Sequence, residues 1–154
     1  MKTNAMRILD SQGIGYEVLR FDYDAQQFDA MDVARQVNMD PQQVCKTIVT
    51  ITDDRRIIIF CIPSPYDISL KKAKQLVHAK TVELVEQKRL RTLTGYVRGG
   101  VSPVGMIHTY PTFAEETIRL FPTITISGGQ RGILLSIAPE NLLKVTSGEW
   151  ADLV

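Results

Sequence analysis

A glycine-rich loop is the first stretch of the sequence that could do chemistry. It reads Gly95-Tyr96-Val97-Arg98-Gly99-Gly100-Val101-Ser102-Pro103-Val104-Gly105. Glycine adopts positive φ without steric cost and proline fixes φ, so the combination predicts a loop of defined shape. Main-chain N–H groups around Gly99 and Gly100 could bind an anion or a carbonyl oxygen. The alternative is a tight turn or β-bulge between two strands, and the composition of the loop favours neither.

Lys46 is the second candidate, because it stands near the start of an otherwise apolar run, Cys45-Lys46-Thr47-Ile48-Val49-Thr50-Ile51. A lysine there either keeps its ammonium in solvent at a strand edge, as lysines usually do, or projects into a polar cavity. In a cavity it would act on negative or developing negative charge, such as a phosphate or an ester carbonyl.

The remaining titratable residues form no recognisable catalytic set. The two histidines, His78 and His108, have no triad spacing to a nucleophile. The pairs Asp53-Asp54 and Glu115-Glu116 are typical of solvated turns and strand edges. No His, Cys, Asp or Glu residues stand at metal-ligand spacing, so we expect neither a metal nor another cofactor.

Basic residues are densest between positions 71 and 91. They are Lys71, Lys72, Lys74, Lys80, Lys88, Arg89 and Arg91. The segment is either a solvated helix face or a surface for phosphates. Because the whole chain carries a formal charge of only +1, any contact with nucleic acid must come from such a local patch.

Length and composition indicate one domain over residues 1–154, long enough to bury a core. Cys45 and Cys61 both lie in apolar runs, which predicts buried thiols in a reducing compartment. The N-terminus has no apolar signal core, and no apolar run is long enough to span a bilayer. We therefore expect a cytoplasmic protein that makes no membrane contact.

Periodicity and turn residues predict the elements that position these candidates. We expect helices over 3–12, 28–37, 69–79 and 139–145, a helical turn over 86–93, and strands over 16–21, 44–52, 56–63, 81–85, 106–110, 112–115, 123–127 and 133–137. Segment 117–121 fits either type. The apolar run 57–62 predicts a strand covered on both faces. Mixed strands and helices with two hairpins favour an α/β or α+β domain around a mixed, curved β-sheet or barrel with surrounding helices.

Three motifs together resemble the YbaK/EbsC family of aminoacyl-tRNA deacylases, relatives of the editing domain inserted in bacterial prolyl-tRNA synthetases. They are Asp40-Pro41 followed by Val44-Cys45-Lys46-Thr47, then the loop 94–105, then Ser127-Gly128-Gly129-Gln130-Arg131-Gly132. Their order and spacing run over nearly the whole chain. The resemblance is strongest to the free-standing Cys-tRNA(Pro) deacylase branch.

The resemblance implies a barrel-like α/β fold and a set of site residues. Lys46 would be the essential lysine, and the main chain at Gly99, Gly100 and Val101 would hold the aminoacyl group. Phe21 would line the pocket and Ser127 would be a pocket serine. Ser102 and Gly128 complete the expected substrate-binding set.

The implied activity is cleavage of the ester of mischarged tRNA(Pro), chiefly Cys-tRNA(Pro), with the substrate's own thiol as nucleophile. Two alternatives stay open: water-dependent hydrolysis of Ala-tRNA(Pro) or another small aminoacyl-tRNA, and a non-catalytic module that binds tRNA or a synthetase. The expected partners are tRNA and prolyl-tRNA synthetase. The expected tRNA contacts are Lys71, Lys72, Lys74, Lys88, Arg89 and Arg91.

Overall fold

The computed structural model describes residues 2–24 and 29–154. Phe28, where the second helix was expected to begin, lies outside the described residues. The helices and 3-10 turns are α1 (Asn4–Ser11), α2 (Ala30–Gln36), η1 (Pro41–Gln43), α3 (Leu70–Val77), η2 (Gln87–Arg89), α4 (Leu90–Thr94), η3 (Glu116–Leu120) and α5 (Pro139–Thr146). The strands are β1 (Glu17–Arg20), β2 (Cys45–Thr52), β3 (Ile57–Pro63), β4 (Val82–Leu84), β5 (Thr112–Glu115), β6 (Ile124–Ser127), β7 (Ile133–Ile137) and β8 (Glu149–Ala151).

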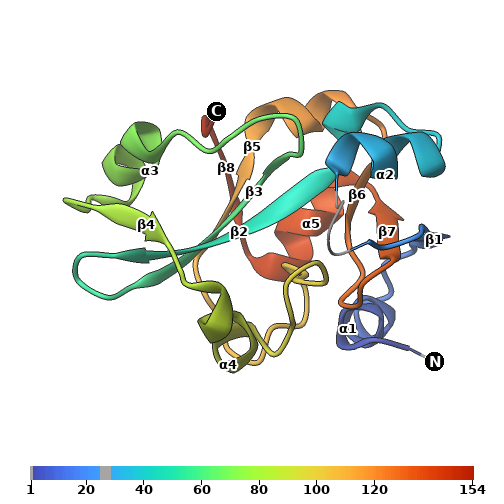
Figure 1. The fold of residues 1–154 in the computed structure, drawn as a ribbon, viewed down its shortest axis with the longest axis horizontal. Helices are drawn as coiled ribbons and strands as arrows, with labels where there is room; N and C mark the ends of the chain where they lie inside the picture. The colour runs from blue at the N-terminus through green and yellow to red at the C-terminus, as the bar shows by residue number, and fades with distance from the viewer. Residues whose placement is uncertain (1, 25–28) are drawn as a thin grey trace.

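Two sheets form the framework (Figure 1). The larger has the order β4-β2-β3-β5-β8, with β2 and β3 antiparallel and with β3, β5 and β8 parallel. The smaller, β1-β7-β6, is antiparallel throughout. One parallel bridge, between Val44 and Thr125, joins the start of β2 to β6. The mixed α/β class is therefore confirmed.

The sheets do not close into a barrel, so that part of the expectation is wrong. A barrel needs a continuous ladder of hydrogen bonds around its circumference. Among the described residues, β4 and β8 are edge strands of three residues each, and a single bridge is the only pairing between the two sheets. The start of β2 consequently lies at an opening between the sheets.

Side-chain caps fix the starts of three helices. The side chains of Thr3, Asp29 and Ser69 accept hydrogen bonds from main-chain N–H groups in the first turns of α1, α2 and α3. Met31 of α2 and Leu70 of α3 are exposed although both are large and apolar. The buried positions of these helices are Val33, Ala34, Ala73 and Val77.

The prediction that β3 is covered on both faces is confirmed. Ile58, Phe60 and Ile62 pack with Ala73 and Val77 of α3 on one face. On the other face, Ile59 packs with Val49 and Val85, and Cys61 joins the largest core cluster. A central strand of a covered sheet buries both sets of alternating side chains, which explains its unbroken apolar sequence.

Two segments differ from the sequence expectation. Residues 106–110 form an irregular segment with a bend rather than a strand, and Ile107 N–H bonds to the Thr94 carbonyl while Tyr110 O–H bonds to the Leu93 carbonyl. Strand β8 was not expected, because its three residues carry too little pattern to predict a strand. No helix among the described residues is long and apolar enough to cross a bilayer.

Candidate active site

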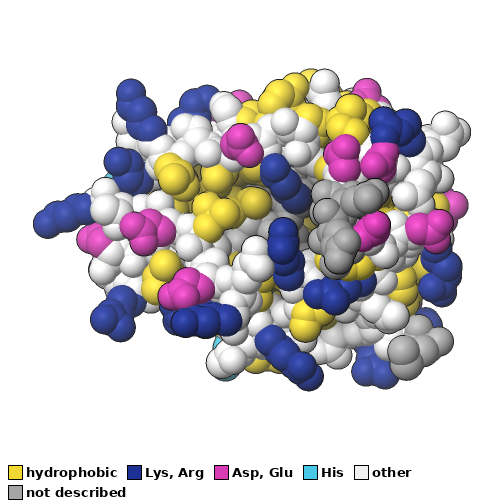
Figure 2. All heavy atoms as spheres, viewed as in Figure 1, with side chains coloured by type: hydrophobic (Ala, Val, Ile, Leu, Met, Phe, Trp, Pro, Cys, Tyr) yellow, Lys and Arg dark blue, Asp and Glu magenta, His cyan; other side chains and the backbone are white. Residues whose placement is uncertain are grey.

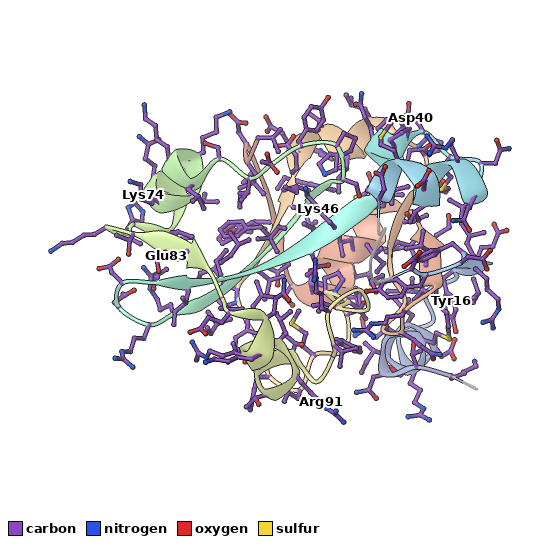
Figure 3. The ribbon with its side chains drawn as sticks, viewed as in Figure 1. Tyr16, Asp40, Lys46, Lys74, Glu83 and Arg91 are labelled. Atoms are coloured by element: carbon purple, nitrogen blue, oxygen red, sulfur yellow. The ribbon has the colours of Figure 1, made fainter. Side chains whose placement is uncertain are left out.

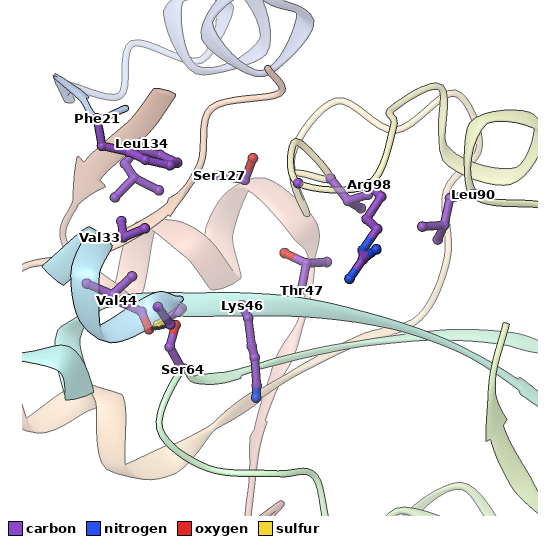
Figure 4. Close-up of a pocket in the computed structure, with 14 residues that line it drawn as sticks. Phe21, Val33, Val44, Lys46, Thr47, Ser64, Leu90, Arg98, Ser127 and Leu134 are labelled. Carbon is purple, nitrogen blue, oxygen red and sulfur yellow. Dashed lines mark hydrogen bonds between the residues drawn. The ribbon is translucent and has the colours of Figure 1, made fainter. Parts of the chain in front are cut away.

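The candidate site is a cavity of about 220 Å³ where β2 begins, between α2, the glycine loop and the β6–β7 hairpin (Figure 4). Five predicted site residues meet there although they are far apart in the sequence. They are Phe21, Lys46, Gly99, Val101 and Ser127. The other lining residues are Ala30, Val33, Val44, Cys45, Thr47, Ser64, Leu90, Arg98 and Leu134.

The cavity has an apolar side made of aliphatic and aromatic groups. Val33 comes from α2, Val44 from the approach to β2, and Leu134 from β7, and all three are buried. They belong to one packed cluster with Phe21 and Leu19 beside it. This wall is preformed and would hold a small apolar group by shape and by exclusion of water.

Lys46 lies on the face of β2 opposite to Thr47, as strand alternation requires (Figure 4). Thr47 points towards the glycine loop, whereas the Lys46 side chain extends to the other side of the strand. Its Nζ lies 3.9 Å from the Asp67 carboxylate, which is fully exposed, and the Lys46 side chain itself is 35% exposed. Such a pair holds a lysine only weakly, so the ammonium can turn to an anionic ligand.

Gly99 supplies a backbone conformation that other residues rarely adopt. Its φ is +86°, and a Cβ at this position would lie 2.7 Å from the ring of Tyr23. Gly99 and Val101 both line the cavity, and their N–H groups donate to no acceptor in the described part of the chain. They are therefore the two loop residues whose main chain can bind a ligand oxygen.

Gly100, unlike Gly99 and Val101, lies outside the lining of the cavity. It is buried and donates its N–H to the Val97 carbonyl at 2.9 Å. A Cβ there would lie 3.1 Å from the main-chain N of Arg131 and C of Gln130. Gly100 therefore lets the loop pack against the hairpin, and its N–H is not available to a ligand.

Ser102 and Gly128 also lie outside the cavity lining and stabilise the loop and the hairpin that form it. Ser102 is fully buried, and its hydroxyl accepts from Val104 N–H at 3.2 Å inside the loop. The Gly128 N–H bonds to Ile133 O at 2.9 Å and so closes the hairpin. Ser127 does line the cavity, and its Oγ accepts from Gly129 N–H at 3.4 Å, which leaves its O–H as a donor.

The predicted basic segment divides into two groups. Lys71, Lys72 and Lys74 are on α3, whereas Lys88, Arg89 and Arg91 are on η2 and α4. Figure 3 shows Lys74 and Arg91 far apart, with β4 and β2 between them. Lys72 is held by Asp152 at 2.9 Å and by the carbonyl of Val154. The η2–α4 group borders the cavity, since Leu90 at the start of α4 lines it.

Arg98 lines the cavity, although no role was predicted for it from the sequence. It stands directly before Gly99, so the loop motif already contained the signal. Figure 2 shows Lys and Arg side chains in a column down the middle of the face that also displays the start of β2 and the glycine loop. Positive charge thus collects at the site although the chain as a whole is nearly neutral.

The lining offers no conventional nucleophile. Cys45 is the only thiol among the described lining residues, and burial, reinforced by the neighbouring Cys61, raises the pKa of this thiol far above the usual value. A buried neutral thiol is a poor nucleophile. No histidine or carboxylate lines the cavity to activate Ser64 or Ser127, and no group of His, Cys, Asp or Glu in the described residues could hold a metal ion.

Comparison with known proteins places these features in a family. Residues 24–145 match the family model of the aminoacyl-tRNA editing domain. The chain is 33% identical over 152 residues to a protein of Enterococcus faecalis named "Putative Cys-tRNA(Pro)/Cys-tRNA(Cys) deacylase EbsC", with 99% of this chain and 93% of that protein covered. It is 22% identical over 123 residues to the proline–tRNA ligase of Bacillus cytotoxicus, covering 79% of this chain and 21% of the ligase.

Solved structures agree in fold. A crystal structure described as "a putative trans-editing enzyme for prolyl tRNA synthetase" matches with a TM-score of 0.86 and 27% identity, covering 99% of this chain and 98% of the other. The hypothetical protein APE2540 matches with a TM-score of 0.88 and 19% identity, over 98% and 99% of the two chains.

Proposed function

Because the chain belongs to the family of aminoacyl-tRNA editing domains, we propose that it is a trans-editing deacylase that clears mischarged tRNA(Pro), with Cys-tRNA(Pro) as its main substrate. The similarity to the Enterococcus faecalis protein over nearly the full length of both chains supports this activity and this substrate. The reaction is cleavage of the ester between the amino acid and the terminal ribose.

One observation carries the proposal: a small cavity combines an apolar wall with main-chain donors and a weakly held cation. Val33, Val44 and Leu134 enclose space for a small side chain. The free N–H groups of Gly99 and Val101 can donate to an ester carbonyl placed beside that wall. The Lys46 ammonium can neutralise the negative charge of the nucleotide or the ester.

Such a site suffices for this chemistry because an aminoacyl ester is already activated. The protein has to hold the carbonyl near its attacking group and to stabilise charge that develops on oxygen. No protein nucleophile is required if the substrate provides one.

We propose that the substrate's own thiol provides it. The cysteinyl sulfur attacks the ester carbonyl carbon, the bond from that carbon to the ribose oxygen breaks, and the thiol proton passes to the leaving oxygen. The products are a cyclic thioester and uncharged tRNA. The neutral, buried Cys45 and the absence of an acid–base pair in the lining support a mechanism without covalent catalysis by the protein.

Deacylation of tRNA(Pro) charged with cysteine, serine, alanine or proline tests the proposal. Serine is nearly isosteric with cysteine, but its hydroxyl has a far higher pKa, so we expect Ser-tRNA(Pro) to be cleared at least about 100-fold more slowly. The first product from Cys-tRNA(Pro) should be the cyclic thioester, detected by mass spectrometry after trapping with an amine.

Other results would select an alternative. Equal rates on the serine and alanine substrates would indicate a positioned water and a site of the alanine-clearing type. Binding of charged tRNA with no deacylation of any substrate would indicate a non-catalytic module. A rate that rises on addition of prolyl-tRNA synthetase would support the synthetase as a partner that delivers the tRNA.

A further inference from the structure

We propose that Arg98 binds the phosphate on the 5′ side of the terminal adenosine of the tRNA, at the rim of the cavity and opposite Lys46. This inference rests on the proposed function and adds a binding residue to it. Arg98 is exposed and comes from the glycine loop, and it lines the same cavity as Lys46 of β2. Figure 4 shows its guanidinium pointing from the loop towards β2.

The charge balance of the cavity favours an anionic ligand. The described residues that line it include two cations, Lys46 and Arg98, and no aspartate or glutamate. Two other exposed arginines, Arg56 and Arg35, have carboxylate partners: Arg56 bonds Asp54 at 2.9 Å, and Arg35 pairs with Asp32. Within residues 2–24 and 29–154, the hydrogen-bond partner of the Arg98 guanidinium is the neutral side chain of Gln87, at 3.4 Å. It is therefore poised for an anion that the protein itself does not supply.

The position of the substrate ester places a phosphate near Arg98. The apolar wall accepts the amino-acid side chain, and the Gly99 and Val101 amides bind the ester, so the ribose and its phosphate must lie towards the rim. A guanidinium matches a phosphate with two parallel hydrogen bonds, which an ammonium cannot reproduce. Because Lys46 and Arg98 line the same cavity, both cations would neutralise the bound nucleotide.

The backbone of Arg98 is fixed by the neighbouring hairpin. Arg131 Nε donates to the Arg98 carbonyl at 2.8 Å, and the Arg131 guanidinium stacks on the Tyr23 ring at 5.1 Å from its centroid. The Gly99 Cα packs against the same ring. The side chain of Arg98 is thus free to bind, while its attachment point is held by the second glycine turn.

The test uses two minimal substrates that differ in one phosphate: 3′-O-cysteinyl-AMP, with a 5′-phosphate, and 3′-O-cysteinyladenosine, without it. The wild-type protein should cleave the phosphorylated ester with a higher kcat/KM. Arg98→Gln should lose about ten- to hundred-fold on that ester and on Cys-tRNA(Pro), as expected for loss of a charged hydrogen bond, and should change little on the adenosine ester. Arg98→Lys should recover part of the loss.

Arg55→Gln is the matched control, since it removes the same charge from the exposed β2–β3 turn, away from the cavity. Equal losses on both esters, or no loss on either, would overturn the proposal. A parallel NMR titration with 5′-AMP and adenosine tests the phosphate-binding role of Arg98 independently of deacylase activity. If wild-type protein cleaves no charged tRNA, the proposed function fails, whereas Arg98 is still judged by whether Arg98→Gln weakens 5′-AMP binding and leaves adenosine binding unchanged.

Discussion

The Nε atom of Arg131 donates a hydrogen bond to the main-chain carbonyl of Arg98 over 2.8 Å. This bond joins the β6–β7 hairpin turn to the glycine loop, and the two residues are 33 positions apart in the sequence. The Gly100 Cα packs against the same turn. The position of the glycine loop, whose amides face the cavity, therefore depends on the β6–β7 hairpin turn. A substitution in either loop should change the geometry of the cavity.

Arg131→Ala should reduce turnover more than stability. The Arg131–Arg98 bond and the stacking on Tyr23 are exposed, so their loss should lower the unfolding free energy by no more than about 1 kcal/mol. The same loss frees Gly99 to move, so its amide is no longer held in position for the ester carbonyl. We expect kcat to fall about tenfold. Arg119→Ala is the control, because Arg119 also stacks on an aromatic ring, that of Trp150 at 5.3 Å, but does not line the cavity. Equal effects of both variants on kcat would contradict the prediction.

Lys46→Ala should lower kcat/KM for Cys-tRNA(Pro) by about 100-fold or more, as expected for loss of a group that stabilises developing charge. Its ion-pair partner, Asp67, is fully exposed, so the unfolding free energy should change by less than about 1 kcal/mol. Urea denaturation and deacylation assays check both statements. Lys144→Ala on α5 removes an equivalent exposed charge and should leave activity unchanged. Near wild-type activity of folded Lys46→Ala would remove Lys46 from the site.

Gly100→Ala should act on stability. The new Cβ would lie 3.1 Å from the main chain of Gln130 and Arg131, and a crowded backbone contact typically costs about 1–3 kcal/mol. Activity per folded molecule should fall by no more than about tenfold, because crowding at Gly100 also shifts its neighbours Gly99 and Val101. Gly15→Ala is the control, because no heavy atom lies within 4 Å of the Cβ position there. Unchanged stability with reduced turnover would show that Gly100 contacts the substrate after all.

The two basic groups should contribute separately to tRNA binding. Replacing Lys88, Arg89 and Arg91 by serine should raise KM for tRNA and reduce the slope of log KM against log salt by about 0.7–0.9 for each phosphate that is no longer neutralised. Replacing Lys71 and Lys74 on α3 should have a smaller effect, since no described residue of α3 lines the cavity, whereas Leu90 of α4 does. An unchanged salt slope in both variants would place the tRNA on another surface.

Stability should fall at alkaline pH because of the buried thiols. Burial raises the pKa of Cys61 to about 12 and that of Cys45 further, while an unfolded thiol titrates near pH 9. Above pH 9 the unfolded chain loses protons that the folded chain keeps, so deprotonation favours unfolding. Each thiol should then cost about 1.4 kcal/mol per pH unit between pH 9 and its folded pKa. Urea denaturation from pH 7 to 10.5 measures this slope.

Cys61→Ala tests the source of that slope. The variant loses stability at neutral pH because it leaves a cavity, but its stability should depend less steeply on pH above 9 than that of the wild type. Parallel curves for the two proteins would assign the alkaline loss to other groups.

The sequence by itself determined the elements with strong local signals. Turn and capping residues and apolar periodicity placed α1 and α3, Pro139 in the first turn placed α5, and the unbroken apolar run of β3 predicted its central, covered position. The motifs around Lys46, Gly99 and Ser127 indicated the family, because each motif is short and lies within one stretch of chain. These signals depend on neighbouring residues, and a single sequence records them directly.

Only the tertiary structure decided how distant segments pack around the cavity. The family resemblance had grouped Phe21, Lys46, Gly99 and Ser127, and the structure supplied the cavity that they line. It also placed Gly100 against the hairpin and added Arg98 to the lining. It also divided the basic segment between two separate surfaces and left the sheets open instead of closed. These outcomes follow from strand pairing, main-chain packing and side-chain direction between distant segments, and no local pattern in a single sequence encodes them.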